Sequence, residues 1–373
     1  MSIFATDLLR ILSVTFIIFN HVSWPFFARS GTASEMPLDS LVALMNQLGK
    51  PSVLIFIFLS GLAFARHRIN AEFKALKFYK NRAGRILPPY LLASFLGVYF
   101  FNTVTPENLP AAFFTGAAMY HLYFVALISY CYLLFPLMRE IKPSKLNILL
   151  LAGSFLSIHF ILALFFPETT NPAFSKFLRD TFAVNYELQI DKTIVLWIEF
   201  LSFALLFFQS GIWIGRNTDK APERSALFFT AAVSVMIAAY FAVFADFNFR
   251  LGEQVHADTS GRTWRMSVLF YAVTWIFLLR NMNVKQSPPL MRRLARASFL
   301  VYLFHPFLIN ITKPMGYTSP VLHTVLIIIS SWTLSILLQH LALKYHLAGL
   351  LLGEGDKIIE KKSKPAIILP QQA

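Results

Sequence analysis

The stretch RILSVTFIIFNH, from Arg10 to His21, sets a nearly continuous apolar run between an arginine and a histidine. It continues directly into VSWPFF, which makes it about 20 residues long, enough for an α-helix to cross a bilayer. Both an arginine and an imidazole are costly to move from water into hydrocarbon. The stretch therefore predicts a membrane-spanning helix that carries two side chains in need of a functional explanation.

The composition places the whole chain in the same solvent. Hydrophobic residues make up 56% of the 373 residues and charged residues 14%, whereas soluble domains average about 45–50% apolar and 25% charged residues. We count ten long apolar segments, at residues 8–27, 42–65, 87–102, 119–138, 146–166, 193–215, 225–245, 265–280, 297–312 and 321–343. The sequence predicts an all-α, polytopic membrane helix bundle of about ten transmembrane helices, with one transmembrane domain over 1–352 and a mobile tail over 353–373.

Several of the predicted spans are short or interrupted by proline. The second contains Pro51 and the ninth contains Pro306. The third starts at the pair Pro88-Pro89, which we expect to set the start of its helix. Interrupted helices are tolerated in a membrane where neighbours or water satisfy the freed backbone groups. We therefore expect these three spans to line an internal cavity.

The net charge of +14 is explained by topology. When the ten spans are threaded through a bilayer, most of the 33 lysines and arginines fall in alternate connections, as the positive-inside rule requires. This distribution predicts a multi-pass protein of the cell's inner membrane with both termini in the cytoplasm. It favours contact with anionic membrane lipid and argues against a nucleic-acid partner.

Arg10 and His21 share one face of the first predicted helix. Eleven residues make about three turns, which separates the two side chains by about 16 Å along the axis. An arginine at the membrane edge offers a fixed cation to a phosphate, and a neutral imidazole deeper in the membrane can accept a proton. In the alternative interpretation, Arg10 extends to the interface and His21 satisfies a backbone carbonyl.

A second basic pair lies in FYKNRAGRILPPY, residues 78–90. Arg82 and Arg85 are three positions apart, so they share a helix face, and two guanidinium groups there could clamp a pyrophosphate. Basic residues before a span also satisfy topology alone. Weaker candidates are His121, Glu199 and His305, each a titratable group in or at an apolar run. Ser60 stands beside Gly61 in FLSG, where small residues permit close helix approach.

Other kinds of site lack support in the sequence. Cys131 is the single cysteine, which excludes an intrachain disulfide or a cysteine metal cluster. No metal-ligand spacing, phosphate loop, dinucleotide fingerprint or nucleophile elbow occurs. We therefore expect no metal and no permanently bound cofactor.

Six segments, in order, resemble the motifs of the integral-membrane acyltransferase-3 family. The pattern from Arg10 to His21 is similar to that family's first-helix motif of a basic residue, ten residues and a histidine. The other segments are FIFLSGLAFARH (56–67), FYKNRAGRILPPYLLA (78–93), HLYFVALISYCYLLFPL (121–137), FFQSGIWIGR (207–216) and SFLVYLFHPFLI (298–309). Tyr123 stands where the family usually has tryptophan, and Leu62 where phenylalanine is common.

The resemblance implies a ten-helix bundle that takes an acyl group, most often acetyl, from cytoplasmic acyl-CoA. The acceptor would be a hydroxyl of a surface carbohydrate or of its lipid-linked precursor. It implies that His21 is the catalytic histidine and general base, that Arg10 is its motif partner, and that Arg82 and Arg85 bind the acyl donor. The matched motifs add further substrate-contact candidates, Tyr90 and Tyr302.

Two other interpretations stay open at this point. Buried charges near interrupted helices also suit a transporter or flippase of a sugar or lipid-linked glycan, although no pair of matching interrupted helices recurs in two halves. An acyltransferase could instead use succinyl-CoA or a non-glycan acceptor. Binding or hydrolysis of acetyl-CoA by the purified protein separates the enzyme from the transporter.

Overall fold

The computed structural model describes residues 1–30, 44–67, 73–142, 144–166, 172–184, 192–216, 226–252, 265–282, 284, 286–312 and 320–354. Within these ranges the regular elements are all helices, without a strand. The predicted all-α membrane bundle is confirmed. Of the tail predicted over 353–373, only Gly353 and Glu354 are described, and the rest lies outside the described residues.

Eight helices are long and apolar enough to cross a membrane, and two shorter apolar helices, α6 and α12, occupy the remaining predicted positions. The long and intermediate helices are α1 (Ile3–Ser30), α3 (Ser52–His67), α4 (Ala75–Phe101), α6 (Tyr123–Met138), α7 (Lys145–Phe165), α9 (Lys192–Arg216), α10 (Ala226–Gly252), α12 (Met266–Arg280), α13 (Pro289–Thr312) and α14 (Pro320–Lys344). The short helices are η1 (Pro106–Asn108), α5 (Leu109–Thr115), α8 (Pro172–Phe182) and α15 (His346–Leu351). The chain is a multi-pass membrane protein.

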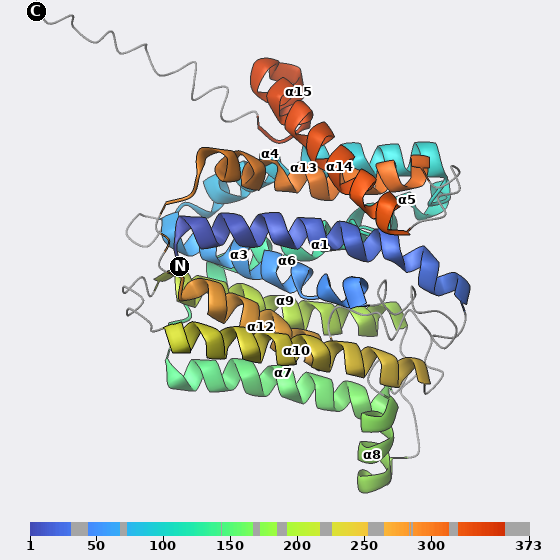
Figure 1. Ribbon diagram of the computed structural model, residues 1–373, viewed down its shortest axis with the longest axis vertical. Coiled ribbons are helices and arrows are strands. Elements are labelled where there is room, and N and C mark those ends of the chain that lie inside the picture. The colour runs from blue at the N-terminus through green and yellow to red at the C-terminus, as the bar shows by residue number, and fades with distance from the viewer. Residues whose placement is uncertain are drawn as a thin grey trace, which may run out of the picture.

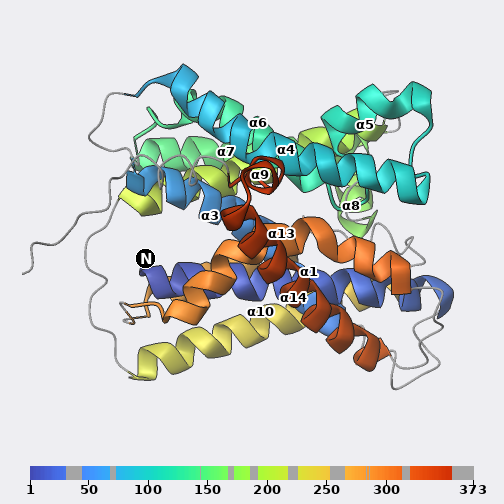
Figure 2. The same cartoon turned by 90° about the horizontal axis from the view of Figure 1, so that it is seen from above.

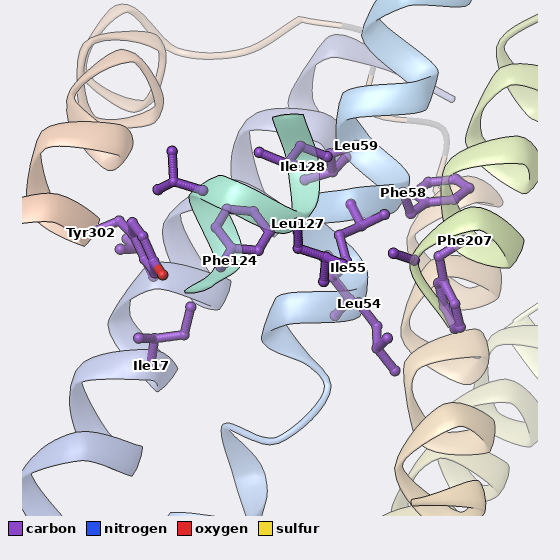
Figure 3. Packing of buried hydrophobic residues seen from close by; sticks show 14 of the residues in the cluster. Ile17, Leu54, Ile55, Phe58, Leu59, Phe124, Leu127, Ile128, Phe207 and Tyr302 are labelled. Carbon is purple, nitrogen blue, oxygen red and sulfur yellow. The ribbon is translucent and has the colours of Figure 1, made fainter. Parts of the chain in front are cut away.

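The long helices lie side by side, and successive ones run in opposite directions (Figures 1 and 2). The chain terminus marked N lies at one end of the bundle, which we call the N-terminal end. Helices α5 and α8 lie at the other end, which we call the α8 end, and α8 crosses it almost perpendicular to α7 (Figure 1). Buried apolar side chains of α1, α3, α6, α9 and α13 meet in the middle, where Ile17, Ile55, Phe124 and Tyr302 lie close together (Figure 3).

The expected start of the third span at Pro88-Pro89 is wrong. Helix α4 begins at Ala75 and contains both prolines. Pro89 has no N–H to donate to the carbonyl of Arg85 four residues earlier. The backbone of Gly353, just after α15, packs against that carbonyl so closely that a Cβ would not fit. A tertiary contact thus lies where the helix lacks a hydrogen bond, and the helix continues.

The other two proline sites differ from each other. The second span is interrupted as predicted, because a turn over 49–51 separates the helical residues before it from α3. Pro306 instead lies inside the continuous helix α13. The short helices α5 and α8 were not predicted, because α5 has only seven residues and α8 is short and interrupted by polar and charged residues, so neither produces a long apolar run.

Helices α3 and α9 cross at their glycines. A Cβ on Gly61 would clash with the carbonyl oxygen of Phe208, and a Cβ on Gly211 would clash with that of Phe58. The two backbones therefore touch, as small residues allow between membrane helices. The close approach predicted for Ser60-Gly61 is confirmed.

Replacing Gly61 by alanine should destabilise the bundle, by roughly 1–3 kcal/mol, because the added methyl meets backbone that cannot turn aside. The measurement is the midpoint temperature at which detergent-solubilised protein loses its monodisperse peak. Gly153→Ala is the matched control, because open space surrounds that position in α7. Equal midpoints for the two variants would contradict the crossing.

Candidate active site

Three histidines that lie far apart in the sequence meet in the half of the bundle nearer the α8 end. His21 comes from α1, His305 from α13 and His121 from the turn before α6. Nδ1 of His21 lies 2.8 Å from Nε2 of His305, and their rings are nearly parallel, with an interplanar angle of 8° and 5.1 Å between the ring centres. The rings of His121 and His305 are 5.5 Å apart, edge to face. With Tyr120 and Tyr302, which touch them, these residues form what we call the histidine cluster.

The hydrogen bonds assign the protons of the His21 and His305 rings. Nδ1 of His305 lies 3.0 Å from the carbonyl oxygen of Val301, and a carbonyl can only accept, so Nδ1 carries the hydrogen. In the neutral ring, Nε2 of His305 is then an acceptor, and Nδ1 of His21 donates to it. This assignment leaves the lone pair of neutral His21 on Nε2, where it can accept a proton.

A buried frame holds His21 in place. His121 and His305 are completely buried, and Tyr302 is 3% exposed. The hydroxyl of Tyr302 donates to the carbonyl of His121, and Nε2 of His121 donates to the carbonyl of Leu303 at 3.3 Å. His21 is partly exposed, so it is the histidine of the cluster that another molecule can reach.

Arg82, Arg85 and Ser60 form a second group, on α4 and α3. The guanidinium of Arg82 lies 5.0 Å from the ring centre of Phe64, a cation–π distance. The phenol of Tyr132 interacts with Ser60 and is close enough to both arginines for electrostatic interaction. We call Arg82, Arg85, Ser60 and Tyr132 the arginine cluster. Arg82 is half-buried and Arg85 is exposed.

Aromatic side chains connect the two clusters. Tyr302 packs on Phe124 at 5.2 Å and Phe124 on Phe56 at 6.0 Å. Ser60 donates to the carbonyl of Phe56 one turn along α3, which brings the row to the arginine cluster.

Arg10 lies on the continuous helix α1, near the N-terminal end, and is partly exposed. His21 lies further along the same helix.

Besides Arg10, two sequence candidates lie outside both clusters. The hydroxyl of Tyr90 donates to the carbonyl of Phe113 at 2.5 Å, which ties α4 to α5. Glu199 is buried on α9, and its Oε1 lies 3.8 Å from Nε2 of His159 on α7. A substrate contact by either residue stays a prediction.

A buried polar network beside His21 was missed by the sequence reasoning. It consists of Asn20, Ser23, Asn46, Gln47, Lys50, Asp246, Arg265 and Ser267. Nζ of Lys50 donates to Oδ1 of Asn20 at 2.8 Å, and Nδ2 of Asn46 donates to the same oxygen at 2.9 Å. The network thus holds the residue that precedes His21.

The same network joins α1 to α10 and α12. Arg265 donates to Gln47 and, at 3.1 Å, to Asp246. Gly49 packs against the carbonyl of Phe16 on α1, with no room for a Cβ. The available signal was the run MNQLGKP inside an apolar segment, because polar and charged residues inside a membrane are expensive and tend to be functional.

The described residues contain no group of three or more histidine, cysteine, aspartate or glutamate side chains arranged to hold a metal ion. In the histidine cluster, the nearly parallel rings of His21 and His305 share a hydrogen bond. The arrangement therefore suits proton transfer between nitrogen atoms and a bound hydroxyl.

Comparison with known proteins agrees with the motifs. A family model described as an acyltransferase domain matches residues 3–340. Neither a curated protein nor a solved structure matches the chain. Because the match covers nearly the whole described bundle, both clusters included, the chain belongs to the acyltransferase-3 family of membrane acyltransferases.

Proposed function

We propose that this protein transfers an acyl group, most often acetyl, from cytoplasmic acyl-CoA to a hydroxyl of a surface polysaccharide or lipid-linked glycan. The family supports acyl transfer in general. The observation that carries the mechanism is the 2.8 Å hydrogen bond between His21 and His305. It leaves a proton-accepting nitrogen on the histidine that substrates can reach.

In this mechanism, Nε2 of His21 takes the proton from the acceptor hydroxyl as its oxygen attacks the thioester carbonyl. The tetrahedral intermediate then collapses, the carbon–sulfur bond breaks, and the coenzyme A thiolate takes the proton back from His21. His305 accepts the Nδ1 hydrogen bond throughout and keeps the ring oriented. General base catalysis of this kind contributes about 10²–10⁴-fold in rate.

The arginine cluster is the proposed donor site. Its cations would hold the phosphates of coenzyme A, with Arg10 as a further cation on the first helix. The pantetheine arm would extend along the aromatic row that ends at Tyr302 and His121. Apolar walls would also limit hydrolysis of the thioester. This arrangement requires the N-terminal end of the bundle to face the cytoplasm of an inner membrane, in agreement with the distribution of basic residues.

Replacing His21 by alanine should lower acetyl transfer by about 10² or more, because the proton acceptor is lost. His305→Phe should lower it by about 10-fold or more, because the ring of His21 loses its partner. In the double variant, the His305 change should have no further effect, since residues that act as a unit are non-additive. The measurement is transfer of radiolabelled acetyl from acetyl-CoA in proteoliposomes.

His323→Phe is the matched control. His323 is also nearly buried and hydrogen-bonded, but to Thr312 and away from the histidine cluster. Binding of coenzyme A should be unchanged in all variants. Full transfer activity in the His21 variant would disprove the role of the base, and additive losses in the double variant would disprove the pairing.

Arg82→Gln should raise the acetyl-CoA concentration at half-maximal rate by about 10-fold, because a charge-assisted contact to phosphate is lost. Arg293→Gln is the control, since Arg293 is an exposed cation near the start of α13. Saturation curves at fixed acceptor concentration provide the measurement. If both variants raise the half-saturating acetyl-CoA concentration equally, the donor is attracted by the general positive potential of the surface and not by the arginine cluster.

Lys50 links the polar network to this mechanism. Its ammonium holds Asn20, the neighbour of His21, and it is close enough to His21 to act on the imidazole electrostatically. The rotation of α1, and with it the direction of the His21 ring, therefore depends on this contact. Lys50 is a positioning residue in the proposed reaction.

Replacing Lys50 by methionine should lower the maximal acetyl-transfer rate by about 10-fold. The half-saturating acetyl-CoA concentration should not change, because the donor site lies elsewhere. Lys145→Met, at the exposed start of α7, is the control. An unchanged maximal rate in a well-folded Lys50 variant would show that the network does not orient His21.

A further inference from the structure

Access to His21 is bordered by one exposed aromatic ring. Within the histidine cluster, Tyr120 is 53% exposed, whereas Tyr302 is 3% exposed and the other two histidines are completely buried. The ring of Tyr120 stands at 89° to that of His21, with 4.9 Å between the ring centres. A molecule that reaches His21 over the accessible surface of the cluster therefore touches Tyr120.

The turn that carries Tyr120 is held firmly on both sides. The turn spans residues 116–122, and Met119 and His121, the residues on either side of Tyr120, are buried. Thr103 donates to the carbonyl of Ala118 at 2.6 Å, and Tyr302 donates to the carbonyl of His121. The turn is anchored to the end of α4 and to α13, so the exposed ring occupies a defined position beside the proposed base.

The start of the turn depends on a backbone conformation that only glycine adopts easily. Gly116 has φ +76°, and its Cα packs directly on the backbone of Leu122 at the end of the turn. Met119 fills the space left by the missing side chain of Gly97 on α4. Residues 118, 119, 121 and 122 of the turn are buried, whereas Tyr120 itself is 53% exposed.

From this arrangement we propose that Tyr120 forms the acceptor subsite, a platform on which one sugar ring of the glycan packs. The inference rests on the proposed function. An aromatic face is electron-rich, which suits the polarised C–H groups on one face of a sugar, and binding sites combine such apolar walls with a few polar groups. Tyr120 changes no covalent bond, but holds the acceptor hydroxyl beside Nε2 of His21.

The position of Tyr120 favours the acceptor over the donor. The aromatic row from the arginine cluster reaches the histidine cluster through Phe124 and Tyr302, both nearly buried. Tyr120 is 53% exposed, and its ring contacts His21 and also His121, where this row ends. In this proposal the donor reaches His21 along the nearly buried row, and the acceptor reaches it over the exposed ring of Tyr120, as a transfer between two bound substrates requires.

The test compares Tyr120→Leu with Tyr120→Phe and Tyr120→Trp. The probe acceptor is surface polysaccharide from cells that lack the gene, freed of esters by mild alkali, and the measurement is transfer of radiolabelled acetyl at varied polysaccharide concentration. Tyr120→Leu should raise the half-saturating polysaccharide concentration by about 10-fold or more. The half-saturating acetyl-CoA concentration should not change, and the two aromatic variants should stay within about threefold of the parent protein.

Tyr99→Leu is the matched control, because Tyr99 is 67% exposed on α4 and contacts only Phe95 and Phe100 among aromatic rings of the described residues. It should leave both concentrations unchanged. An unchanged polysaccharide dependence in Tyr120→Leu would overturn the proposal, as would a shift confined to acetyl-CoA, which would assign the ring to the donor path. If a change of lipid composition restored the activity lost in Tyr120→Leu, the ring would instead contact the membrane surface, and the proposal would be overturned.

These outcomes differ from a failure of the proposed function. If the parent protein transfers no acetyl group to the polysaccharide, the function itself is wrong. If the parent protein transfers acetyl and depends on His21, but Tyr120→Leu shows parental saturation curves, only the acceptor subsite is wrong.

Discussion

The hydrogen bond between His21 and His305 joins residues 284 positions apart, and the other features of the site depend on it. A neutral imidazole in a membrane needs a partner for its N–H, because no bulk water is present to provide one. His305 supplies that partner, and the carbonyl of Val301 determines which nitrogen of His305 accepts. The lone pair of neutral His21 is thereby left on Nε2.

Two features stabilise a bundle with this polar interior. Glycines let α3 and α9 touch along their backbones, which adds close packing where lipid provides no hydrophobic drive for association. Polar side chains satisfy one another in the network from Lys50 through Asn46 and Gln47 to Arg265. The glycine contacts fix the position of α3, and the polar network fixes the position of α1, which carries His21.

Local rules predicted much of this arrangement and failed at identifiable places. The long apolar runs predicted the positions of the long helices, and helix geometry predicted that Arg10 and His21 share a helix face. The rule that proline starts or ends a helix failed at Pro88-Pro89, which lie inside α4. There Gly353 packs against the carbonyl of Arg85, which receives no hydrogen bond from Pro89. Helix α8 was not predicted, because its few apolar residues do not form a long run.

The sequence by itself determined the solvent and the helical class of this protein, because long apolar stretches have one stable arrangement in a bilayer: helices that satisfy their own backbone. It also singled out His21, His121 and His305 as separate candidates. Only the tertiary structure decided that these three meet, that Lys50 holds Asn20, and that Glu199 pairs with His159 instead. The contacts that decide chemistry join distant segments, and apolar periodicity carries no information about which faces of a membrane helix will touch.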